Sequence, residues 1–162
     1  GHWPVPGVRV FATPGHISHH VSYLAEADGT FVAGDALGVI LAPGAPTYPP
    51  TPPPSVDVPA WLETLHGLES VGPDAFGVSH FGVHDDFEGR LIAMRTALSA
   101  LRDRVEGALG SANDSDRDVY EREVRDAISE FRPRDEVDGY FDAFSAAVDW
   151  DGMRFYLERA AS

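Results

Sequence analysis

The sequence contains neither cysteine nor lysine. The absence of cysteine excludes disulfides, thiolate metal ligands and cysteine nucleophiles, so histidine and carboxylate side chains must hold any bound metal. The sequence also lacks an uninterrupted apolar run of about 18 residues, which excludes a membrane-spanning helix of the usual kind. No amino-terminal signal sequence is recognisable, and the expected location is the cytoplasm.

The charge of the chain is strongly one-sided. It has 26 acidic residues against 12 basic ones, all arginine, for a formal net charge of -14. Such a chain repels nucleic acid and anionic membranes, so neither is an expected partner. One interpretation is a need for solubility in a genome rich in arginine codons. The other is adaptation to a high-salt cytoplasm, where salt screens the self-repulsion, and the complete absence of lysine favours it.

The second interpretation gives the first testable prediction. We expect the protein to lose structure as the salt concentration falls, because unscreened repulsion among the surplus carboxylates opposes the compact state. Thermal unfolding over a range of NaCl concentrations measures this directly. A melting temperature that does not depend on NaCl would contradict halophilic adaptation.

Residues 1–84 are predicted to form a mixed unit of strands, one helix and a loop. Short apolar or alternating runs, bounded by turn residues, predict strands at 8–12, 21–24, 30–33 and 75–79. Asp57 is a predicted N-cap for a helix that extends to about Val71. Residues 42–59 are rich in proline. This loop is either a rigid surface connection or part of a functional site.

Residues 85–162 are predicted to be helical. Apolar residues recur at steps of three and four from Phe87 to Leu109, as in a long amphipathic helix. Further helices are expected at 120–131 and from about 137 to 148, followed by a final turn or short helix. The spacing in the long helix is also compatible with packing against a second chain.

Three residues with metal-ligand chemistry follow predicted strands. His16 comes after Thr-Pro-Gly, Asp35 after a glycine, and His80 directly before Phe-Gly. Taken singly, each has an ordinary structural explanation as a cap or a partly buried histidine. Together they can converge on one edge of a sheet, where imidazole and carboxylate are suitable zinc ligands and a carboxylate can bridge two cations. His19 and His20 assist the site, line its pocket or face solvent.

The ordered set Thr-Pro-Gly-His, Gly-Asp-Ala and Ser-His-Phe-Gly resembles the metallo-β-lactamase-fold hydrolases, the superfamily that includes glyoxalase II. Segments 12–24 (ATPGHISHHVSYL) and 31–36 (FVAGDA) carry most of the resemblance. It implies an α/β fold, namely the C-terminal half of an αββα sandwich with a helical C-terminal extension. It also implies two divalent metal ions, zinc first and manganese or iron as alternatives. His16 would ligate the first metal, Asp35 would bridge both, and His80 would ligate the second.

One part of the family's pattern is missing. The sequence contains no His-x-His-x-Asp-His motif, which supplies the remaining ligands in that family. We therefore expect a fragment, or one half of a split or swapped assembly, that is inactive alone. The complete enzyme would hydrolyse an ester, thioester or amide of a small molecule with a metal-bound hydroxide, as glyoxalase II-like enzymes do. The alternative is a non-catalytic binding or dimerisation module built on the helical bundle, with a homo-oligomer or swapped dimer as the assembly.

Overall fold

The computed structural model describes residues 5–111 and 115–161. Its sheet has five strands in the order β1-β2-β3-β4-β5, and β3 and β4 are parallel whereas the other neighbours are antiparallel. The first four strands confirm those predicted, and β5 was not predicted. The strand bounds are β1 Val8–Ala12, β2 Val21–Ala25, β3 Thr30–Gly34, β4 Ala75–Val78 and β5 Val83–His84.

The connection between the parallel strands carries most of the loop structure. It contains the short 3-10 helix η1 (Asp35–Leu37), the proline-rich loop and α1 (Val58–Leu68). Asp57 caps α1, because its carboxylate accepts a hydrogen bond of 3.0 Å from the amide of Ala60. The proline-rich loop is not a surface connection. Several of its side chains are buried, among them Ala42, Ala45, Tyr48, Thr51 and Val56.

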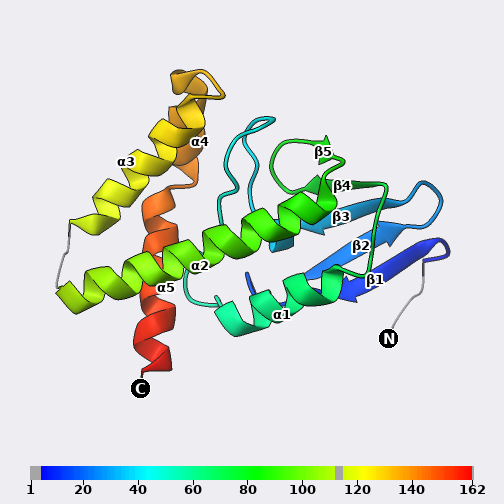
Figure 1. The fold of residues 1–162 in the computed structure, drawn as a ribbon, viewed down its shortest axis with the longest axis horizontal. Helices are drawn as coiled ribbons and strands as arrows, with labels where there is room; N and C mark the ends of the chain where they lie inside the picture. The colour runs from blue at the N-terminus through cyan, green and yellow to red at the C-terminus, as the bar shows by residue number, and fades with distance from the viewer. Residues whose placement is uncertain (1–4, 112–114, 162) are drawn as a thin grey trace.

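The long helix α2 (Phe87–Ser111) joins the sheet to the C-terminal helices. It begins over the sheet, where the ring of Phe87 contacts those of Phe31 and Phe76. It packs against α5 (Ala146–Ala160), which gathers with α3 (Asp116–Ser129) and α4 (Arg134–Ala143) at the end of the molecule away from the β1–β2 hairpin (Figure 1). The apolar stripe of α2 is buried within the chain, at Leu91, Met94, Leu98, Leu101 and Val105.

The helix expected at 137–148 is wrong, because the chain breaks there into α4 and α5. Phe144 leaves the helical conformation with φ −131° and ψ 66°. The carboxylate of Glu121 accepts hydrogen bonds from the hydroxyl of Ser145 and the amide of Ala147. A side chain from α3 therefore satisfies the first amides of α5, as an N-cap residue would do locally.

Other helix ends also differ from the predicted ones. α1 ends at Leu68, so Val71 lies in the following turn. α2 continues through Gly110 and Ser111, two residues beyond the pattern that ends at Leu109. The final segment is a full helix of 15 residues rather than a short one. Among the described residues, no helix is long and apolar enough to span a membrane.

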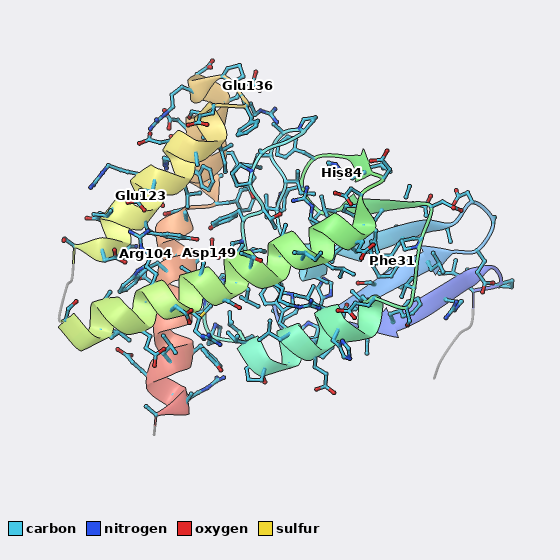
Figure 2. All side chains as sticks on the ribbon, in the orientation of Figure 1. Phe31, His84, Arg104, Glu123, Glu136 and Asp149 are labelled. Atoms are coloured by element: carbon cyan, nitrogen blue, oxygen red, sulfur yellow. The ribbon has the colours of Figure 1, made fainter. Side chains whose placement is uncertain are left out.

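Arginine side chains tie the C-terminal helices together. Arg104 of α2 pairs with Asp116 and Glu123 of α3, as the labelled side chains of Figure 2 show for Arg104 and Glu123. The guanidinium of Arg104 lowers the pKa of Asp116, whose carboxylate also accepts from the indole of Trp150. This one carboxylate therefore links α2, α3 and α5.

One face of the sheet is apolar and exposed. The strand register aligns Val10, Tyr23, Val32, Gly77 and Val83 in a single row across all five strands. The exposed fractions of the four side chains in this row are 63%, 41%, 49% and 67%. The opposite face carries Phe31 and Phe76, which are fully buried. No described element covers the exposed row, which we call the open sheet face.

Candidate metal centre

His16, Asp35 and His80 come together at one edge of the sheet. The Nε2 atom of His16 lies 3.8 Å from Oδ2 of Asp35, and Nε2 of His80 lies 3.9 Å from Oδ1. Each imidazole therefore faces a different oxygen of the same carboxylate. The three side chains are 14%, 25% and 27% exposed, so they remain accessible from solvent.

A close contact between backbone and core fixes the turn before His16. Gly15 has φ +144°, and a Cβ at this position would lie 2.3 Å from Cβ of Trp61. The indole of Trp61 is fully buried and donates a hydrogen bond of 2.9 Å to the carbonyl of Ala36. Its ring also contacts the imidazole of His16 at 5.8 Å between centroids. The glycine thus lets His16 sit directly on the core of the domain.

The hydrogen bonds of His16 define its tautomer. Nδ1 lies 2.8 Å from the carbonyl oxygen of Pro50. Because a carbonyl can only accept, Nδ1 must carry the proton, and in the neutral ring Nε2 keeps a free lone pair directed towards Asp35. Histidine ligands of metals are commonly oriented by donation from the other ring nitrogen to a carbonyl in this way.

His20 lies beneath Asp35 in a directed chain of hydrogen bonds. The amide of Asp35 donates to Nε2 of His20 at 3.2 Å, and Nδ1 of His20 lies 2.7 Å from the hydroxyl of Thr13. That hydroxyl lies 2.9 Å from Ser22, which donates to the carbonyl of Ala33 at 3.0 Å. Since Nε2 of the neutral ring accepts, Nδ1 must donate to the hydroxyl of Thr13. That hydroxyl must then donate to Ser22, because the hydroxyl of Ser22 donates to Ala33. Burial lowers the pKa of His20, which favours the neutral ring that this arrangement requires.

This series of hydrogen bonds starts at Asp35, directly after β3, and ends at Ala33 within β3. The register between β3 and β4 shifts between Val32 and Gly34, and the pairing of β2 with β3 stops at Val32. Side chains therefore satisfy backbone groups beyond the end of the ladder. Gly34 has φ +61°, and a Cβ there would lie 2.7 Å from Nε2 of His20. Glycine is thus required at position 34 for two reasons: its positive φ disfavours other residues, and a Cβ would clash with the imidazole of His20.

Aromatic rings from the C-terminal helices surround His80. Its imidazole contacts the rings of Tyr140 and Phe144, each at 5.5 Å between centroids. The next residue, Phe81, has φ +65°, the one positive value among the described non-glycine residues. The guanidinium of Arg132 lies over the Phe81 ring at 4.4 Å and helps to hold this strained turn.

The remaining histidines lie apart from the three candidate ligands. His19 is exposed in the turn before β2. His66 pairs with Glu69 at the surface of α1. His84 of β5 lies 3.1 Å from the carbonyl of Phe81 through Nε2. Of the two histidines considered as helpers of the site, only His20 contacts a candidate ligand among the described residues.

The donor set fits part of a metal centre. Within residues 5–111 and 115–161, no group of three or more histidine or acidic side chains could hold a metal ion alone. Two ligand atoms on one tetrahedral zinc ion with bonds of 2.0–2.1 Å lie about 3.3 Å apart. The two separations at Asp35 slightly exceed this value, so each histidine and its facing oxygen can supply two ligands to one ion.

A cavity of about 330 Å³ adjoins the three residues. Its walls come from the candidate ligands, from Tyr48, Pro50 and Pro52 of the proline-rich loop, and from α4 and α5. Sequence reasoning missed the contributions of Thr13, Ser22 and Pro50. Polar residues at the end of the first predicted strand and within the second were the available signal for Thr13 and Ser22, whereas nothing local marks the carbonyl of Pro50.

This sheet with a helical layer on one face is similar in fold to part of a solved metallo-β-lactamase family protein. A metallo-beta-lactamase family protein from Thermus thermophilus matches with a TM-score of 0.56 and 22% identity, covering 95% of this chain and 44% of that chain. An archaeal metallo-beta-lactamase superfamily protein from Sulfolobus tokodaii matches with a TM-score of 0.45 and 28% identity, over 58% and 33% of the two chains. No protein-family model and no curated protein matches the sequence.

The predicted α/β fold of metallo-β-lactamase type with a helical C-terminal part is therefore confirmed. The chain spans less than half the length of either solved structure. The likeness concerns the fold. The assignment of His16, Asp35 and His80 as metal ligands stays a prediction.

Proposed function

We propose that this chain carries part of the two-metal centre of a hydrolase. One observation carries the proposal: the carboxylate of Asp35 presents one oxygen to His16 and the other to His80, at 3.8 and 3.9 Å. A carboxylate that turns one oxygen towards each of two imidazoles is suited to bridge two cations. Zinc is the first choice for histidine and carboxylate ligands, and manganese or iron is the alternative.

When bound, two such ions polarise a carbonyl or phosphoryl oxygen and lower the pKa of a water molecule. The residues of this chain orient the ligands. His16 donates to Pro50 and leaves Nε2 free, while His20 holds the backbone of Asp35. Burial and the charge of Asp35 raise the pKa of Tyr140 to about 12, so its phenol stays protonated beside the site. The proposed reaction is hydrolysis of an ester, thioester or amide of a small molecule, with glyoxalase II-like thioester hydrolysis as one case.

The test is the metal content of the isolated chain. Elemental analysis after dialysis at high salt without chelator should give well below one zinc ion per chain, because each ion would have only two ligands from this chain. Manganese and iron are measured in the same sample. A ratio of two would contradict the expectation of an incomplete centre, and it would mean that His19, His20 or a second copy completes the site.

The alternative, a non-catalytic module that dimerises through its helical bundle, has less support. The apolar stripe of α2 packs on its own chain, so it offers no free seam to a partner. The open sheet face offers an apolar surface instead. We propose that a second sheet covers it, supplied either by another segment or by a second copy in a swapped arrangement.

We also propose the high-salt adaptation set out above. Many arginine side chains of the described residues form ion pairs with carboxylates, yet the net charge of the chain is -14. Pairing therefore leaves a large surplus of carboxylates that only counterions can screen.

A further inference from the structure

The cavity beside the candidate metal centre has one end lined by side chains to which no ligand role is assigned. Tyr140 of α4, Phe144 after it and Val148 of α5 line this end, and Pro50 and Pro52 form the adjoining wall. The rings of Tyr140 and Phe144 lie 5.2 Å apart. These side chains offer a mainly apolar surface to whatever occupies the cavity.

The cavity has no cationic lining. Its charged or titratable residues are the two histidines of the centre, the phenols of Tyr48 and Tyr140, and the carboxyls of Asp35 and Asp149, whereas no arginine lines it. Asp149, labelled on α5 in Figure 2, is 6% exposed, and burial raises the pKa of its carboxyl well above the usual value. In the metal-free chain, an anion placed here would lose its hydration without gaining a cationic side chain in return.

One residue of the cavity wall, Tyr48, carries an unused hydrogen-bonding group. Tyr48 is 4% exposed, and its hydroxyl has no hydrogen-bond partner in the described part of the chain. Most buried polar groups in folded proteins are paired. A polar atom of a bound molecule would supply the missing partner.

We propose that this cavity binds the uncharged, apolar acyl portion of the substrate, with one polar atom within reach of the Tyr48 hydroxyl. Aryl and branched alkyl acyl groups of neutral esters, thioesters and amides fit this description, and substrates that carry an anionic group at this end do not. The proposal rests on the proposed hydrolase function. It limits the substrates of that same site to those whose acyl group is uncharged.

Two probes of similar shape test the proposal: phenylacetamide and phenylacetate. Each is titrated into the chelator-dialysed chain at high salt, and binding is followed by NMR chemical shifts. The amide should bind at least about tenfold more tightly than the carboxylate, because the amide does not have to lose the hydration of a charge. Equal or tighter binding of phenylacetate, or no binding of the amide, would overturn the proposal.

Two arginine variants supply a matched comparison. Val148 lines the cavity and is 41% exposed, whereas Ile92 of α2 is 56% exposed and lies outside the cavity. Val148→Arg should raise the affinity for phenylacetate about tenfold by adding a cation, and Ile92→Arg should leave the ratio of affinities unchanged. Equal effects of the two variants would refute the location of the binding site.

The orphan hydroxyl has its own variant. Tyr48→Phe should weaken the binding of phenylacetamide by about 2- to 10-fold, the usual contribution of one hydrogen bond. An unchanged affinity would overturn the role of the hydroxyl. All titrations use metal-free protein. Failure of the metal centre therefore leaves these results standing, and failure of the probe experiment leaves the metal assignment standing.

Discussion

Asp35→Asn is expected to weaken zinc binding by at least about 100-fold, the upper end of the effects known for residues that only support a ligand. The substitution keeps the shape of the side chain but removes the negative charge that lies between His16 and His80. A neutral amide also offers only one oxygen, so it can face one histidine but not both. Calorimetric titration of Zn²⁺ into both proteins at high salt measures the change.

Asp85→Asn is the matched control for this prediction. Asp85 is exposed, follows His84 and does not line the cavity of the candidate centre. The Asp85→Asn variant should bind zinc as tightly as the unmodified chain does, and both variants should melt at similar temperatures in the absence of metal. If Asp35→Asn and the control bound zinc equally well, the assignment of Asp35 as a bridging ligand would be wrong.

Gly152→Ala is expected to lower the free energy of unfolding by about 3 kcal/mol or more, the upper range for overpacking. A Cβ on Gly152 would lie 1.7 Å from the carbonyl oxygen of Thr51 and 2.8 Å from the nitrogen of Pro53. The side chain of Asp149 accepts from the amide of Thr51, and the hydroxyl of Thr51 donates back to its carbonyl at 2.8 Å. The methyl group would push apart α5 and the loop that carries Pro50.

Chemical unfolding at high salt measures this loss, with Gly139→Ala as the control. Gly139 lies within α4, and a Cβ there meets no atom within 4 Å. Alanine at this position should stabilise the protein by about 0.5–1 kcal/mol, because it restricts the unfolded chain and favours the helix. Similar stabilities for the two variants would mean that α5 and the loop do not pack as described.

The candidate site was predictable where its signal is local. His16, Asp35 and His80 each follow a short strand, and each has a glycine within two residues, which is a local pattern in the sequence. Their convergence follows from the sheet, because neighbouring strand ends share an edge. The ordered likeness to a known superfamily sharpened the interpretation, and the observed fold agrees with it.

The features that escaped prediction depend on contacts between distant residues. The break after α4 is capped by Glu121, more than twenty residues away in the sequence. The carbonyl that orients His16 belongs to Pro50, and the wall of the cavity depends on Thr51 meeting Asp149 across 98 positions. Hydrophobic periodicity carries no information about such pairs, since it reports which face of an element is buried but not what lies against it.

The hydrogen-bond chain beneath Asp35 restricts which sequences can encode this edge of the sheet. Position 20 needs a side chain that accepts at one end and donates at the other. The side chain at position 13 must then accept a hydrogen bond from position 20 and donate one to position 22. The side chain at position 22 must donate to the backbone carbonyl of Ala33. A hydroxyl satisfies either of these last two demands, whereas a carboxylate or an ammonium reverses or interrupts the direction. We therefore expect the fold to tolerate combined substitutions at positions 13, 20 and 22 that keep the same donor-to-acceptor direction, and seldom a single substitution at one of them.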